Sequence, residues 1–209
     1  RSIHVPVPTW PYWSPDDGIH PVAGALRGLY SGGTLADEAM IIAGDILGDI
    51  RSNIPLAPEL ALPASATGHG LPKLGGLGHV IVDLGDDEFT RGRPHPMIDP
   101  TVKLDLLAAQ AADPDVTVIL LDVVLGYGSE PDPAARLAPA IGNAISAAAA
   151  AGRELAVIVS LCGTDGDPQN REAVATALAH AGADVYASNA AAARAAAHAA
   201  VGQTERDDA

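Results

Sequence analysis

Five short apolar runs, each followed by a stretch with helical periodicity, constrain the fold of this chain more than any other feature. Runs of this length without polar alternation are typical of strands that are buried on both faces of a sheet. The predicted strands are LRGLYS at 26–31, GHVIVDLG at 78–85, DVTVILLDVVLG at 115–126, LAVIVSLCG at 155–163 and DVYAS at 184–188. The predicted helices are 34–47, 100–112, 133–151, 169–181 and 190–201.

Strands that alternate with helices favour a parallel sheet covered by helices on both faces. The predicted fold class is therefore α/β, a three-layer αβα flavodoxin-like domain. Its sheet would hold five parallel strands in the order 2-1-3-4-5.

The regular alternation covers only part of the chain. Residues 1–24 are rich in proline and hold both tryptophans, which predicts an extended N-terminal arm or linker. It could join domains, lie on a neighbouring surface or cover a ligand. The predicted domain spans 25–202 and contains a long loop or insertion at 51–77, and 203–209 form an acidic tail.

Charge and cysteine content narrow the classes of partner. The chain has 209 residues and a formal net charge of −14, from 12 Lys and Arg against 26 Asp and Glu. Nucleic acids and anionic membranes need a basic face, so neither is an expected partner. A single cysteine, Cys162, rules out an internal disulfide. With no signal-peptide pattern and no apolar run of membrane-spanning length, we expect a cytoplasmic protein.

The loops after the strands are where ligands bind in a doubly wound sheet. The first is Ser31, Gly32, Gly33 and Thr34. Glycines allow a tight turn and a close backbone approach, and the two hydroxyls could cap the helix that follows. A helix N-terminus favours phosphate or carboxylate, so this turn is a candidate anion site. The alternative is a plain helix cap. A dinucleotide or P-loop site is not expected, because GxGxxG and a Walker lysine are missing.

The second loop carries alternating cations. Arg91, Arg93 and His95 would point the same way in an extended segment stiffened by prolines, and could clamp a carboxylate or phosphate. The alternative is a surface network in which the upstream acids at 86–88 pair with the arginines. Those acids show no recognisable metal-ligand spacing, and no metal site is predicted.

Two further side chains are candidate reactive groups. Cys162, at the end of the fourth strand, could be a nucleophile, but a buried inert thiol is the favoured interpretation. His69, in a glycine-flanked loop, could carry a phosphoryl group or act in acid–base chemistry, but a solvated loop histidine is favoured.

Four segments together carry a resemblance to a known family. They are GLYSGGTLADEAM, HVIVDLGDDEFTRGRPHPMIDP, VILLDVVLGYGSEPDP and VIVSLCGTDGDPQ. They resemble the FdrA family of acyl-CoA-synthetase-like proteins, which is similar to the succinyl-CoA synthetase α-subunit, from about 26 to 200. The resemblance implies the flavodoxin-like ligase domain without the CoA-binding domain that normally precedes it.

In the synthetases the turn equivalent to Ser31–Thr34 holds the phosphate of a phosphohistidine. That histidine lies in a long loop after the fourth strand, which here is the short CGTDGDPQ and has none. The FdrA family is associated with oxamate carbamoyl transfer, in which oxalurate and phosphate yield oxamate and carbamoyl phosphate in allantoin and purine catabolism. The first hypothesis is therefore an FdrA-type carbamoyltransferase subunit.

Under this hypothesis Ser31, Gly32, Gly33 and Thr34 cradle phosphate, and Arg91, Arg93 and His95 are catalytic. Substrate contacts would come from Gly163, Thr164 and Asn189. The alternatives are an acyl-CoA ligase of the succinyl-CoA synthetase type, with His69 as its local histidine, and a non-catalytic anion-binding assembly subunit. Expected partners are small anionic substrates and other subunits or copies of the chain. CoA or a nucleotide would bind only through a partner domain.

Overall fold

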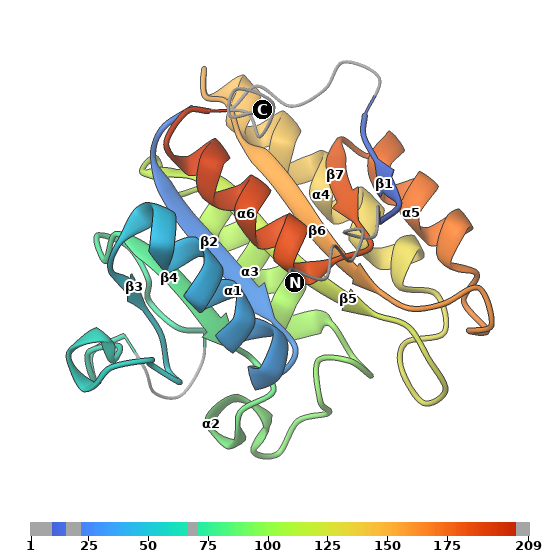
Figure 1. Cartoon of the computed structure of the whole chain (residues 1–209), viewed down its shortest axis with the longest axis horizontal. Helices are drawn as coiled ribbons and strands as arrows, with labels where there is room; N and C mark the ends of the chain where they lie inside the picture. The colour runs from blue at the N-terminus through green and yellow to red at the C-terminus, as the bar shows by residue number, and fades with distance from the viewer. Residues whose placement is uncertain (1–9, 16–21, 67–70, 204–209) are drawn as a thin grey trace, which may run out of the picture.

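A mixed but mostly parallel sheet forms the centre of the molecule (Figure 1). The computed structural model describes residues 10–15, 22–66 and 71–203. Seven strands follow the spatial order β1-β7-β6-β5-β2-β4-β3, and every neighbouring pair is parallel except β1 and β7. The strands are β1 Tyr12–Trp13, β2 Ala25–Tyr30, β3 Ile50–Arg51, β4 His79–Asp83, β5 Val116–Val124, β6 Ala156–Cys162 and β7 Ala183–Tyr186.

The α/β class and the parallel core are confirmed, but the prediction of five strands is wrong. The sheet has seven strands, and its order differs from the predicted one because β1 and β3 extend its two edges. Each of these edge strands has only two residues, which is too short to produce a periodic pattern. The five longer strands are arranged as β4-β2-β5-β6-β7, which is the relative order predicted for them.

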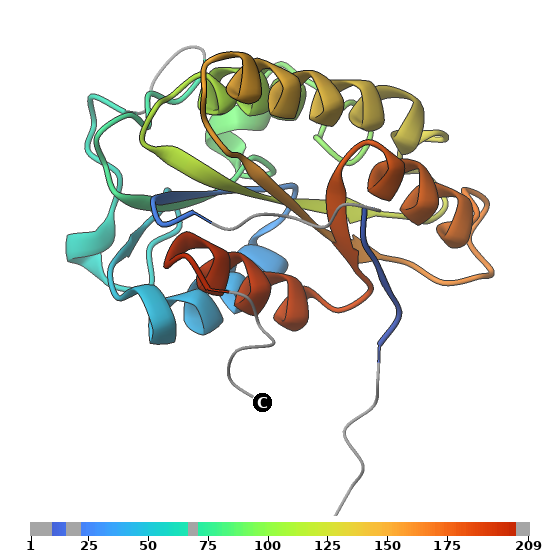
Figure 2. The ribbon, with the colours of Figure 1, turned by 90° about the horizontal axis from the view of Figure 1, so that it is seen from above.

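Helices cover both faces of the sheet, as Figure 2 shows from above. The helices α1 and α6 pack on one face, and α3, α4 and α5 pack on the other. Two short segments lie in loops, η1 Pro58–Leu60 and α2 Asp87–Thr90. The longer helices are α1 Gly33–Leu47, α3 Thr101–Ala111, α4 Pro133–Ala150, α5 Arg171–His180 and α6 Asn189–Ala200, within two residues of the predicted bounds.

The described part of the N-terminal arm lies along the edge of β7. The ring of Tyr12 contacts that of Tyr186 with 4.6 Å between centroids. Trp13 Nε1 donates to Glu172 at 2.9 Å, and Ser14 Oγ donates to Asp184 at 2.7 Å. An antiparallel strand therefore covers an edge that would otherwise expose unpaired backbone groups.

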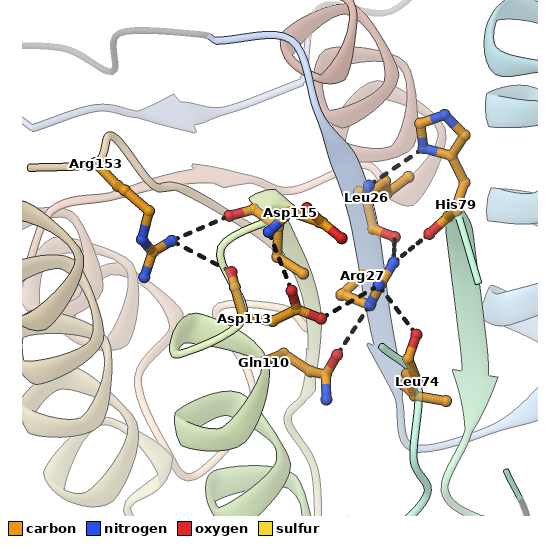
Figure 3. Close-up of polar contacts among 10 residues, drawn as sticks. Leu26, Arg27, Leu74, His79, Gln110, Asp113, Asp115 and Arg153 are labelled. Carbon is orange, nitrogen blue, oxygen red and sulfur yellow. Dashed lines mark hydrogen bonds and ion pairs between the residues drawn. The ribbon is translucent and has the colours of Figure 1, made fainter. Parts of the chain in front are cut away.

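A buried arginine connects segments near the amino ends of the parallel strands (Figure 3). These ends lie opposite to the loops that follow the strands. Arg27 is fully buried and donates to Gln110 at 2.9 Å and to the carbonyl oxygens of Leu74, at 3.1 Å, and Gly78. Its carboxylate partner is Asp113, at 3.8 Å. These bonds join β2, α3 and the segment before β4. The polar groups at the amino ends of the strands therefore stabilise the fold.

No helix in the described part of the chain is both long and apolar enough to cross a membrane.

Candidate functional site

A buried lysine, aspartate and serine meet where β2 and β5 approach their carboxyl ends. Lys103 of α3, Asp122 of β5 and Ser31 are each no more than 3% exposed. The Lys103 ammonium donates to Ser31 Oγ at 2.6 Å, to the Asp122 carbonyl oxygen at 2.7 Å and to Asp122 Oδ1. All three ammonium protons thus have acceptors, which is what a buried charge requires.

The same carboxylate oxygen holds the turn that follows β2. Asp122 Oδ1 accepts the Ser31 amide at 2.9 Å and the Ser31 hydroxyl at 3.0 Å. Asp122 Oδ2 is buried, and no described residue donates a hydrogen bond to it. Ser31 lies inside this network, with both of its polar donors already bonded, and so it supports the turn from below.

The predicted helix caps are wrong. The N-cap of α1 is Gly32, in an extended conformation, and no side chain caps the helix. Ser31 cannot do so, because the Lys103–Asp122 pair already binds its hydroxyl. Ala36 is the first residue whose amide donates into the helix, to Gly32 at 3.3 Å. Among the described residues nothing accepts from the amides of Gly33, Thr34 and Leu35, which leaves donors at the positive end of the helix dipole.

A carboxyl group and an imidazole lie near the turn that precedes α1. Asp83, at the end of β4, accepts the Gly85 amide through Oδ1 at 2.8 Å. A Cβ on Gly85 would come within 2.4 Å of the Ser31 carbonyl oxygen, 2.7 Å of His95 Nε2 and 3.1 Å of Asp83 Oδ1. Gly85 is therefore required by close approach, and these three groups surround one point.

The environment perturbs the Asp83 carboxyl group. Burial raises its pKa, and the carboxylates of Asp86 and Asp122 act in the same direction, while the Gly85 amide and His95 oppose them. The imidazole of His95 is oriented by the Met97 amide, which donates to Nδ1 at 3.3 Å. In neutral His95 the proton consequently lies on Nε2, the atom that faces Gly85.

The insertion contributes to this site through Asn53. Its side-chain amide donates to the Asp83 carbonyl oxygen at 3.0 Å and accepts the Asp83 amide at 2.9 Å. These paired bonds fix the end of β4 as a neighbouring strand would. Part of the 51–77 segment therefore acts as a support for Asp83.

Of the predicted cationic loop, the structure brings His95 to the turn. Arg91 and Arg93 follow α2 and are exposed, and their side chains make no hydrogen bond or ion pair with described residues. The proposed pairing of upstream acids with these arginines is not seen there. Asp86 instead caps α2 by accepting the Glu88 amide at 2.9 Å.

The remaining predicted site residues have structural contacts. A Cβ on Gly163 would lie 2.8 Å from the side chain of Leu125. The Thr164 amide donates to Asp167 at 2.6 Å within its own loop. Asn189 donates to the Leu35 carbonyl oxygen at 2.9 Å and to Glu38 at 2.8 Å, and accepts from Tyr30 at 3.0 Å. Their role as substrate ligands stays a prediction.

The structure tests the prediction for Cys162 but not the one for His69. The expectation of a buried thiol is wrong, because Cys162 is exposed at the end of β6. Partial burial nevertheless raises its pKa, with Asp122 and Asp167 acting in the same direction, and a raised pKa lowers the fraction of reactive thiolate. His69 lies outside the described residues. No cluster of three or more metal-ligating side chains occurs within the described ranges.

Sequence reasoning missed Asp83, Lys103 and Asp122, although the sequence contains a signal for each of them. Asp83 and Asp122 are charges inside otherwise apolar strands, and Lys103 lies among the apolar residues of α3. Charged residues are rarely buried unless paired, so such positions mark either an ion pair or a site.

The comparisons with known proteins show which family the chain belongs to. A family model described as CoA-ligase matches residues 29–199. The chain belongs to the CoA-ligase family. The matched range takes in the turn before α1, Asp83, His95 and the buried Lys103–Asp122 pair, so the whole candidate site lies inside the CoA-ligase domain. Membership of the FdrA branch stays a prediction.

A curated relative extends the comparison. This CoA-ligase domain is 41% identical over 164 residues to the uncharacterized protein YahF of Escherichia coli K12. The match covers 78% of this chain and 30% of YahF. The chain thus spans less than a third of the length of this relative.

Proposed function

We propose that this CoA-ligase domain takes part in an acid–thiol ligase reaction and binds the phosphate of an acyl phosphate at the N-terminus of α1. The proposal is carried by one observation. Inside the family match, at the carboxyl edge of the sheet, the amides of Gly33, Thr34 and Leu35 have no acceptor among the described residues. Such a helix end binds anions through its amides and its dipole.

The site would act on the leaving group. When a thiolate attacks the acyl carbon, a sulfur–carbon bond forms, the carbon–oxygen bond to phosphate breaks, and phosphate leaves with the electron pair. Fixed amide donors stabilise that developing charge without rearrangement during the reaction. His95 Nε2 would donate to the same anion, and Arg91 and Arg93 would attract the acid substrate electrostatically.

The family match favours this reaction over the oxamate carbamoyltransferase hypothesis. The matching model names CoA-ligase, and no contact among the described residues favours a carbamoyl donor. CoA and any nucleotide would bind through another domain or a partner subunit. In the complete ligase, this domain would supply the binding site for the acyl phosphate.

A matched pair of variants at Gly33 tests the anion site. Gly33 is the first residue of α1 and follows an extended residue, a position where proline is tolerated. Gly33→Pro removes one amide donor, whereas Gly33→Ala adds a Cβ and keeps the donor. We expect acetyl phosphate, titrated by calorimetry, to bind Gly33→Pro about tenfold more weakly than Gly33→Ala, the effect of one charge-assisted hydrogen bond.

Circular dichroism of both variants controls for loss of fold. Equal affinities of the two variants for acetyl phosphate would contradict the proposed contact. Absence of binding to the wild-type domain at millimolar acetyl phosphate would contradict the proposed function itself.

A further inference from the structure

The proposed anion site has a carboxyl group in its wall. Asp83 is 7% exposed, and its Oδ1 accepts the Gly85 amide. No hydrogen bond to Asp83 Oδ2 occurs among the described residues, and this oxygen lies 3.3 Å from the position that a Cβ would take on Gly33. An oxygen of a nearly buried side chain, without a donor among the described residues, therefore lies beside the helix end at which an anion would bind.

An ionised Asp83 would oppose such an anion. A phosphate oxygen bonded to the Gly33 amide would lie close to Asp83 Oδ2, and a negative charge there disfavours the ionised form of the carboxyl group. A protonated carboxyl group removes the repulsion. Its O–H can also donate a hydrogen bond, which an ionised carboxylate cannot do.

The groups that face Asp83 come from several elements. Asp86 at the start of α2 and Asp122 of β5 are negative, and His95 in the loop before α3 is the nearby base. Lys103 of α3 lies behind, bonded to Asp122 and Ser31. From α1 the facing residue is Gly33. Burial and the two carboxylates raise the pKa of Asp83. Protonation of Asp83 therefore costs less free energy than protonation of an exposed aspartate.

We propose that Asp83 takes up one proton from solvent when an anion binds at the N-terminus of α1, and donates its new O–H to that anion. This inference rests on the proposed anion site and adds a condition to it. Binding of a phosphate-like dianion strengthens as the pH falls, and an Asp83 that cannot ionise removes this dependence.

Sulfate is the probe for this coupling, because it remains a dianion from pH 5.5 to 8 and brings no proton of its own. Calorimetric titrations in EDTA, in buffers of different ionisation enthalpy, count the protons taken up for each sulfate bound. For the wild-type domain near pH 7 we expect uptake that approaches one proton, and affinity that rises up to about tenfold for each unit of falling pH.

The variants separate Asp83 from its neighbours. Asp83→Asn should bind sulfate at pH 8 at least tenfold more tightly than wild type, without proton uptake. His95→Gln removes the nearby base and should retain the uptake. Asp87→Asn neutralises an exposed carboxylate of α2 and should behave like wild type.

Each opposite result is decisive. Sulfate binding that is weakened in Gly33→Pro but releases or takes up no proton leaves the anion site standing and overturns the coupling. Loss of uptake in His95→Gln assigns the proton to the imidazole and also overturns it. Binding that appears only when Mg²⁺ replaces EDTA, and is abolished in Asp83→Asn, makes Asp83 a metal ligand and overturns the coupling. If neither the wild-type domain nor any of the variants binds sulfate at any pH tested, both proposals are overturned.

Discussion

At the scale of single residues, Lys103 supports the candidate site most directly. Its ammonium bonds Ser31 and two oxygens of Asp122, all beneath the turn that opens α1. A buried ion pair of this kind contributes little net stability relative to an apolar pair, but removal of one partner leaves a buried charge uncompensated. The pair therefore fixes the geometry of the turn.

The variant Lys103→Met leaves Asp122 without its counter-ion. We expect a loss of about 3–5 kcal/mol in the free energy of unfolding, measured by urea denaturation at pH 7. Arg136→Met is the matched control, because Arg136 pairs with Asp99 on the surface at 2.9 Å and its loss should cost less than about 1 kcal/mol. Similar losses for both variants would show that the buried pair is not held as described.

At the scale of elements, the amino ends of β2 and β4 are joined by a titratable group. The Leu26 amide donates to His79 Nδ1 at 3.2 Å (Figure 3). Burial lowers the pKa of His79, and the charge of Arg27 acts in the same direction. A protonated imidazole cannot accept this hydrogen bond, so the neutral form belongs to the fold.

The pH dependence of stability follows from that direction. Because the pKa of His79 is lower in the folded state, the unfolded chain binds more protons between the folded value and about 6.5. The contribution of neutral His79 to the free energy of unfolding is present above about pH 6.5 and is lost as the pH falls below that value. Urea midpoints from pH 8 to 5.5 should drop more steeply for wild type than for His79→Gln.

His180→Gln is the control for this experiment, since His180 is exposed at the end of α5. It should follow the wild-type curve. An identical slope for His79→Gln and wild type would show that His79 does not couple folding to pH.

At the scale of the whole molecule, the arm decides how one edge of the sheet meets solvent. The strand β1 pairs with β7, and Trp13 packs against the core between them and α5. Removal of residues 1–15 should leave a folded domain with a lower urea midpoint. The open β7 edge should also promote association between copies, visible by analytical ultracentrifugation.

Trp13→Phe is the milder comparison for this truncation. It keeps the backbone pairing of β1 and removes the indole bond to Glu172. It should remain as monodisperse as wild type. If the truncated domain shows unchanged stability and no association, the arm does not protect this edge.

The elements and the candidate site differ in how far the sequence could predict them. The bounds of strands such as β5 and helices such as α4 were predicted to within two residues, because their apolar patterns are long. The strands β1 and β3 were not, because two residues carry no periodicity. At the site, the sequence located the Ser31–Thr34 turn, but the partners of Asp83 lie in loops and strands that only folding brings together.

The sequence by itself determined the α/β class, the relative order of the long strands and the position of the glycine turn. These depend on local periodicity and on the rule that ligand loops follow parallel strands. The tertiary structure decided that Ser31 is held by Lys103 and Asp122 instead of capping α1, and that Asp83 and His95 face the same turn. Such assignments depend on distances between residues far apart in the chain, where burial and competing charges determine which polar groups remain free.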